Sequence, residues 1–131
     1  MFFHGGVRSR RKGDVLLPRS RTKVATAPYP GVDYSPDFVY LSTSEDAARV
    51  WAAMYVKLPA SGPKSVGGDL YEVEALDDLE PDPDDPTPGL SYRTKLARVV
   101  RVVERRVRMS EDEADELMTL AILRHRQLPR G

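Results

Sequence analysis

Residues 38–46, FVYLSTSED, decide the fold class of this chain. The first four are aromatic, β-branched or aliphatic, a composition that favours a strand. The polar residues that follow indicate the start of a helix, because Ser42 with Glu45, or Thr43 with Asp46, has the spacing of a capping box. A strand that leads directly into a capped helix predicts a fold of mixed α and β structure.

The helix after this strand is predicted to run from about Glu45 to about Lys57. Residues 58–68, LPASGPKSVGG, have the proline, glycine and serine content that is typical of a loop. The alternation of residues 70–74 predicts a half-buried strand. Apolar residues recur along the helix at helical spacing and predict its core-facing stripe, which consists of Ala47, Val50, Trp51 and Met54.

The residues before position 38 predict a short strand and a long loop. Phe2-Phe3-His4 is typical of a strand, and Gly5-Gly6 predicts that this strand ends in a turn. Residues 15–17 form a short apolar segment, which is followed directly by Pro18. Residues 18–37 have several prolines and little periodicity, which indicates a long loop of the kind that often carries function.

The C-terminal part predicts strands followed by a helix. Four prolines in residues 81–88 exclude a helix or a central strand there. The valine- and arginine-rich residues 96–107 predict one or two strands. Ser110 with Glu113 is a second capping box, so a helix is expected from about residue 111 to about 126, within a C-terminal segment 110–128. The expected apolar face of this helix has Ala114, Leu117, Met118, Ala121, Ile122 and Leu128. The predicted class is α+β.

Composition limits the possible classes of protein. The chain has 131 residues, which suits one domain over 1–131, and 20 basic side chains balance 20 acidic ones. It has no cysteine, which excludes a disulfide or thiol chemistry, and its two histidines make a metal site unexpected. No apolar run approaches the ~20 residues that cross a bilayer, and residues 1–13 do not resemble a signal peptide. We therefore expect a cytoplasmic monomer without metal or membrane contacts.

The zero net charge conceals three segments of strongly unequal charge, which we call charge bands. Residues 1–24 have seven basic side chains and one acid, residues 69–85 have nine acids and no base, and residues 93–108 have seven bases and one acid. Two interpretations are open. In the first, the bands are solvated faces that pair across the fold. In the second, a basic surface meets an acidic site, as expected for a polyanionic ligand such as nucleic acid or a pyrophosphate.

Three features are candidates for chemistry. His4 stands at the end of a strand before two glycines, Tyr40 precedes a capped helix, and an acidic proline-rich loop follows the strand at 70–74. The chain has no GxGxxG, Walker A, HExxH or GxSxG motif, so standard phosphate loops and nucleophile elbows are unsupported.

Taken in order, these features resemble the rifamycin ADP-ribosyltransferases, which belong to the His-Tyr-acid class. The resemblance covers about residues 2–103 and depends on six segments. They are Phe3-His4-Gly5, the GDVLLP of 13–18, the VYLST of 39–43 with Asp46-Ala47-Ala48 and Trp51, the YEVE of 71–74, Leu79-Glu80 with Asp82-Pro83, and the SYRT of 91–94.

The resemblance implies a small ADP-ribosyltransferase-like domain with NAD as its co-substrate. His4 would hydrogen-bond the ribose, and Tyr40 would stack on the nicotinamide. Asp82 would be the catalytic carboxylate that stabilises an oxocarbenium-like cation or deprotonates the acceptor, and the acids that contest this role are Glu80, Asp84 and Asp85. Further contacts with the co-substrate are expected from Gly5, Trp51, Arg8, Arg19, Ser91 and Tyr92, with Tyr55, Arg10, Arg11, Arg21 and Arg93 as other candidates.

The acceptor and two other functions stay open. Gly6 replaces the threonine that is usual in the family, and residues 82–91 are shorter than in the rifamycin enzymes. The acceptor is therefore either a rifamycin-like hydroxyl, as in rifamycin resistance, or a host macromolecule, and a bacterial or bacteriophage protein fits both. The first alternative is a non-catalytic module of the same fold that binds NAD, ADP-ribose or a protein. The second is a nucleic-acid-binding protein that uses the arginines of 8–23 and 93–108.

Overall fold

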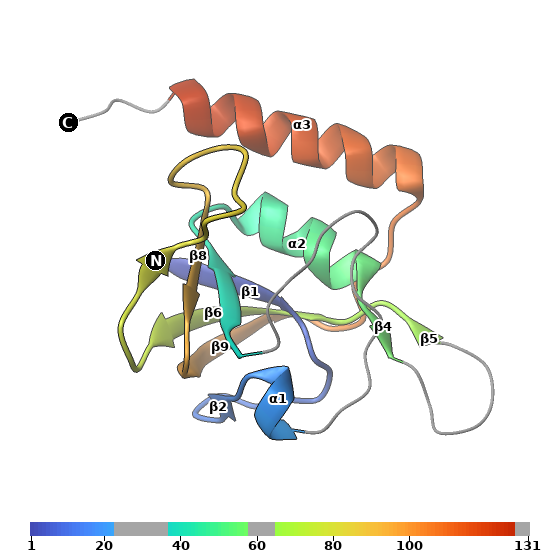
Figure 1. Ribbon diagram of the computed structural model, residues 1–131. Coiled ribbons are helices and arrows are strands. Elements are labelled where there is room, and N and C mark those ends of the chain that lie inside the picture. The colour runs from blue at the N-terminus through green and yellow to red at the C-terminus, as the bar shows by residue number, and fades with distance from the viewer. Residues whose placement is uncertain (23–36, 58–64, 128–131) are drawn as a thin grey trace.

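The computed structural model describes residues 1–22, 37–57 and 65–127. In this part of the chain an antiparallel sheet has seven strands, in the order β2-β9-β6-β1-β3-β8-β7 (Figure 1). The strands are β1 (Phe2–Gly6), β2 (Val15–Leu16), β3 (Val39–Ser42), β6 (Asp69–Ala75), β7 (Glu80–Pro81), β8 (Ser91–Thr94) and β9 (Ala97–Glu104). A separate pair joins β4 (Val56–Lys57) to β5 (Ser65–Val66).

Two longer helices cover one face of the sheet. Helix α2 (Glu45–Met54) lies between the sheet and α3 (Glu111–Gln127), while the short α1 (Arg19–Thr22) lies near β2 (Figure 1). The molecule is thus a small α+β domain, which confirms the predicted class. None of its described helices is both long enough and apolar enough to span a membrane.

The packing between α2 and the sheet depends on small residues. Phe3 of β1 and Leu70 of β6 form a cluster with Ala48 and Ala52 of α2. Gly5 lies so close to the helix that a Cβ atom there would be 2.0 Å from the carbonyl oxygen of Ala48. On the other face of the sheet the core cluster consists of Leu16, Val39, Leu41, Tyr71, Val73, Ala97 and Val99.

The helix after β3 is confirmed, but the predictions of its N-cap residue and of its last residue were wrong. Ser44 is the N-cap, and its hydroxyl accepts a hydrogen bond from the Ala47 amide at 3.1 Å. Ser42 is unavailable for this role because it belongs to β3 and its hydroxyl donates to the Leu90 carbonyl at 2.8 Å. The helix ends at Met54 rather than near residue 57, because the next residues pair with β5.

Other local predictions have mixed outcomes. The turn expected at Gly5-Gly6 was wrong, since β1 continues to Gly6 and pairs with β6 along its whole length. The loop expected at 18–37 includes α1, and its residues 23–36 lie outside the described residues, as do 58–64 of the next expected loop. The strand expected at 70–74 is confirmed as β6, and the proline-rich stretch contributes only the edge strand β7.

The C-terminal predictions are confirmed. The valine-rich stretch forms the single strand β9, and α3 begins at Glu111. Its capping box is reciprocal: the Glu113 amide donates to the Ser110 hydroxyl and the Ser110 amide donates to the Glu113 carboxylate, both at 3.1 Å. Ala114 and Ala121 are buried on the expected face of α3, and Leu128 lies outside the described residues.

Candidate functional site

The described backbone pairing in the centre of the sheet leaves an opening between β1 and β3, which is a stretch without register partners and not a cavity. Strand β1 pairs with β6 from Phe2 to Gly6, whereas its described pairing with β3 consists of one register position, Phe3 opposite Ser42. Beyond Phe3 the link between the two strands is a side chain. The His4 imidazole reaches the carbonyl oxygen of Tyr40, with Nδ1 at 2.7 Å from that oxygen. The first two candidate residues are therefore joined across this opening.

The environment of His4 sets its protonation state. A carbonyl oxygen can only accept, so Nδ1 has the proton and Nε2 is the acceptor nitrogen of a neutral ring. Burial lowers the pKa of His4, and the hydrogen bond to Tyr40 opposes this effect only in part. The ring also stacks on Tyr71, with 6.5 Å between the centroids. Within the described residues no hydrogen-bond partner lies at Nε2, so this nitrogen is a preformed acceptor.

A glycine leaves space beside this acceptor. A Cβ atom on Gly6 would lie 3.2 Å from His4 Nε2 and 3.7 Å from the ring of Tyr55. A larger side chain at position 6 would therefore crowd the nitrogen. Gly6 thus leaves the space next to Nε2 open.

Tyr40 belongs to a row of side chains across β3, β8 and β7. Tyr40 is in register with Arg93, and Arg93 is in register with Glu80, so the three side chains project from one face of the sheet. Arg93 forms an ion pair with Glu80, and its guanidinium lies 4.0 Å from the centroid of Phe38. Desolvation lowers the pKa of Arg93, but its hydrogen bonds to Glu80 and Tyr40 raise it by more.

The His4 and Tyr40 side chains leave their strands on opposite faces. Tyr40 alternates with Val39 and Leu41, which share a core cluster with Tyr71, and Tyr71 is the ring on which His4 stacks. The contact between the two candidates thus runs from the imidazole to the backbone of Tyr40.

Asp82 has a structural role in the connection from β7 to β8. Only 8% of it is exposed, and its carboxylate accepts hydrogen bonds from the Ser91 hydroxyl at 3.1 Å and from the Asp84 amide at 2.9 Å. Asp85 acts similarly by accepting from the amides of Thr87 and Ser91. Of the four acids considered for catalysis, Glu80 is the one that the strand register places beside Arg93, in the same row as Tyr40.

The other expected contact residues are dispersed. Gly5 packs against α2 and Trp51 is half-buried on that helix. Tyr92 packs edge-on against Phe2, on the face of the sheet opposite Arg93. The side chain of Arg19 lies outside the described part of the chain. Tyr55 does not share a helical face with Trp51, because it follows the last residue of α2 in an extended conformation.

The charge bands pair with each other along β6 and β9. Arg98 pairs with Glu74 at 3.4 Å and Arg101 pairs with Glu72 at 2.9 Å, as cross-strand ion pairs. Arg93 and Arg105 also have carboxylate partners. Four of the seven bases in 93–108 are therefore neutralised within the fold. This arrangement favours the interpretation of the bands as paired faces.

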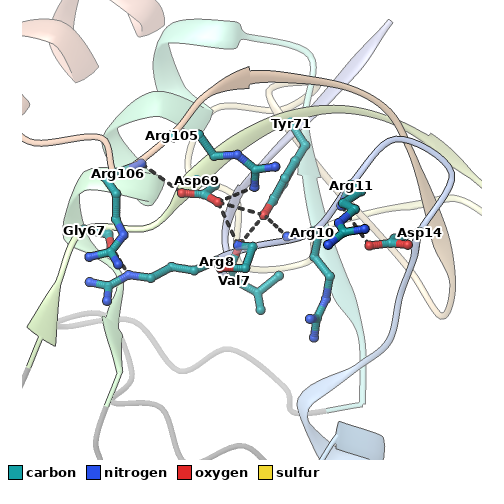
Figure 2. Close-up of polar contacts among 11 residues, drawn as sticks. Val7, Arg8, Arg10, Arg11, Asp14, Gly67, Asp69, Tyr71, Arg105 and Arg106 are labelled. Carbon is teal, nitrogen blue, oxygen red and sulfur yellow. Dashed lines mark hydrogen bonds and ion pairs between the residues drawn. The ribbon is translucent and has the colours of Figure 1, made fainter.

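A buried carboxylate that the sequence interpretation missed organises the loop after β1. Asp69 is 2% exposed and accepts hydrogen bonds from the Ser9 amide at 2.8 Å, the Arg106 amide at 2.8 Å and the Arg105 guanidinium at 2.7 Å (Figure 2). Burial raises the pKa of Asp69, but these hydrogen bonds lower it by more. The available signal was an acid at the head of the alternating strand segment, directly before Leu70.

Tyr71 extends this network. Its hydroxyl donates to the Val7 carbonyl at 2.6 Å and accepts from the Arg10 amide at 3.1 Å (Figure 2). Burial raises the pKa of Tyr71 to about 12, so the hydroxyl keeps its proton at neutral pH. Asp69 and Tyr71 thus fix the backbone of residues 7–10, and with it the direction in which Arg8 leaves the chain.

No metal centre is apparent in the part of the chain that the structure covers: no three histidine, aspartate or glutamate side chains there gather as ligands. In comparisons with protein-family models and with curated proteins, this chain matches none. The candidate site therefore has to be interpreted from its own geometry.

Proposed function

We propose that this protein is an NAD-dependent mono-ADP-ribosyltransferase of the His-Tyr-acid class. The observation that carries the proposal is the contact between the His4 imidazole and the Tyr40 carbonyl across the opening between β1 and β3. Four of the six segments that resemble the rifamycin enzymes contribute to the adjacent strands β6, β1, β3 and β8. That adjacency of distant segments supports a common site.

His4 and Gly6 fit the ribose of NAD. The neutral imidazole presents Nε2 as an acceptor, which matches a ribose hydroxyl donor, and Gly6 leaves the space that such a hydroxyl needs. When bound, NAD would supply an anomeric carbon that bonds to the acceptor oxygen while its bond to nicotinamide breaks and the electron pair leaves with nicotinamide. His4 would orient this carbon, and its contribution would be positional.

Glu80 is the proposed catalytic carboxylate in place of the expected Asp82. Its side chain is half exposed and shares a sheet face with Tyr40, whereas both carboxylate oxygens of Asp82 are engaged by Ser91 and Asp84. A carboxylate at this position would stabilise positive charge on the ribose and accept the proton of the acceptor hydroxyl. Arg93 holds Glu80 in place through their ion pair.

The pyrophosphate role expected for Arg8 is not part of this proposal. Its Nε donates to the Gly67 carbonyl and its Nη2 donates to the Val66 carbonyl at 3.0 Å, so its guanidinium is directed toward β5. The acceptor is a small-molecule hydroxyl of the rifamycin type or a macromolecule.

The direct test is an incubation of the purified protein with NAD, followed by chromatography of released nicotinamide. Rifampicin and a cell lysate are offered in separate reactions, and mass spectrometry identifies which of them gains ADP-ribose. We expect nicotinamide release above that of a His4→Ala, Glu80→Gln double variant with the same fold. Absence of release with either acceptor, together with absence of slow NAD hydrolysis, would contradict the enzymatic proposal.

The second candidate is a non-catalytic module that binds NAD or ADP-ribose. The engagement of Asp82 by Ser91 favours it, since the acid that the resemblance identifies as catalytic is then structural. This alternative predicts NAD binding by calorimetry without turnover, and binding that is unchanged in Glu80→Gln. A nucleic-acid role is less supported, because four arginines of the basic band already have carboxylate partners.

A further inference from the structure

A cavity of about 400 Å³ lies between β5 and the segment that joins β9 to α3. Its apolar wall includes Ala53 and Met109, and its cationic residues are Arg8, Arg106 and Arg108. This volume is within the range of small-molecule sites. None of its lining residues belongs to the group formed by His4, Tyr40, Glu80 and Arg93, so the cavity is separate from the proposed reaction site.

The charges that line this cavity are of one sign. Among the residues that the structure describes, three arginines and no acidic residue line it. The arginines elsewhere on β9 and just beyond it differ, since Arg98, Arg101 and Arg105 each have a carboxylate partner. Among the described residues, the exposed Arg106 and Arg108 side chains form no ion pair. The guanidinium groups of Arg106 and Arg108 repel each other, and a bound anion would relieve that repulsion.

The surrounding structure fixes where these arginines lie. The Arg8 guanidinium is held by the carbonyls of Val66 and Gly67, and the Arg106 backbone is held by Asp69 through its amide. Arg106 has a φ of 49°, in the left-handed region. Figure 2 shows the Arg8 and Arg106 side chains extending to the same side of the Asp69 network. Hydrogen bonds thus hold the Arg8 side chain and the Arg106 backbone in place beside the cavity, and the Asp69 network has a role beyond holding the loop.

We propose that this cavity binds a small organic phosphate. Arg106 and Arg108 would hold the phosphate oxygens, for which the planar guanidinium is suited, and the apolar wall at Met109 and Ala53 would hold the organic part. The inference goes beyond the proposed transferase function and does not rest on it, because the ligand and the residues that hold it are different.

The test is calorimetric titration of the intact protein with phenyl phosphate, which combines a phosphate dianion with an apolar ring. The variant is Arg106→Gln with Arg108→Gln. The matched control is Arg98→Gln with Arg101→Gln, which removes the same charge from a neighbouring part of the molecule where each arginine is already paired. We expect saturable binding at one site, a loss of affinity of about tenfold or more in the cavity variant, and no change in the control. Circular dichroism verifies that both variants are folded.

Other results would overturn the proposal. Absence of saturable binding, or an equal loss in both variants, would mean that the cavity is not a site and that only net charge matters. If inorganic phosphate binds as tightly as phenyl phosphate, the proposed contact between the apolar wall and the organic part of the ligand is wrong. Displacement of phenyl phosphate by NAD in direct competition would assign the cavity to the transferase co-substrate rather than to a second ligand. Turnover of NAD is measured separately, so failure here leaves the proposed function intact.

Discussion

At the scale of single residues, buried polar groups decide both stability and the position of the candidate sites. Asp69 and Tyr71 bind the backbone of residues 7–10, and His4 binds the backbone of Tyr40. Each is a polar side chain whose partner is distant in sequence. Because a buried polar group without a partner costs more than a satisfied one contributes, each of these residues depends strongly on its partners.

Replacement of Asp69 by asparagine is expected to destabilise the protein and to change its dependence on pH. The folded pKa of Asp69 is below its ordinary value of 3.8, so the ionised carboxylate stabilises the fold above that pH. This contribution disappears as the pH falls from 3.8 through the lower folded pKa. We expect a loss of about 2–4 kcal/mol at neutral pH, measured by urea unfolding. The difference between wild type and Asp69→Asn should shrink below pH 3.8, and a constant difference would contradict this account.

The choice between Glu80 and Asp82 as the catalytic acid is testable with isosteric amides. In Glu80→Gln the turnover of NAD is expected to fall by about two orders of magnitude or more with little change in the unfolding midpoint, since Glu80 is on the surface. In Asp82→Asn the free energy of unfolding is expected to fall by about 1–2 kcal/mol, because the amide disturbs hydrogen bonds from Ser91 and Asp84. Turnover lost only in Asp82→Asn would return the catalytic role to that residue.

At the scale of elements, the helix caps and the paired strands β6 and β9 explain most of the local structure. Helix α3 begins where its capping box predicts, whereas α2 begins two residues later than a cap at Ser42 implies. The strand β3 decides this difference, because a residue within a strand cannot also have the geometry of a helix cap. Ion pairs between β6 and β9 add surface complementarity, although each exposed pair contributes little stability.

The assignment of the α2 cap predicts different effects for neighbouring hydroxyls. Ser44→Ala is expected to lower the free energy of unfolding by about 1 kcal/mol, because the Ala47 amide loses its partner. Thr43→Ala serves as the control, since its exposed hydroxyl binds the Gly89 carbonyl and does not cap the helix. Thermal unfolding followed by circular dichroism compares the two variants. A larger effect at Thr43 would contradict the assignment of the cap.

At the scale of the whole molecule, the sheet and α2 approach each other through residues without side-chain bulk. Gly5, Ala48 and Ala52 lie at this contact, and β1 is in the middle of the sheet. Strand β1 therefore cannot move away from α2 without disturbing β6 and β3. The same strand has His4, so packing of the helix and geometry of the candidate site are linked.

Gly5→Ala tests this link. The added methyl would lie 2.0 Å from the Ala48 carbonyl oxygen, so the helix must shift, and we expect a loss of about 3 kcal/mol in the free energy of unfolding. Gly13→Ala is the control at a position with open space, where the positive φ of 91° alone should cost about 1 kcal/mol. Urea unfolding measures both variants. Equal effects would mean that the close contact between β1 and α2 is not important for stability.

The amino-acid sequence by itself determined the class of fold, the four strands β1, β3, β6 and β9, and both longer helices. These features depend on alternation, helical spacing and capping residues, which act between near neighbours. The order of its motifs also predicted His4 and Tyr40 as candidate site residues, and the contact between the His4 imidazole and the Tyr40 carbonyl is seen only in the structure. Only the tertiary structure decided that Ser44 caps α2, and that Asp82 is engaged by Ser91 while Glu80 lies beside Arg93 in the row that includes Tyr40. It also decided that four arginines of the basic band have carboxylate partners, whereas Arg106 and Arg108 have none among the described residues. The physical reason is that strand register and burial depend on contacts between residues far apart in the chain, so local patterns do not contain them.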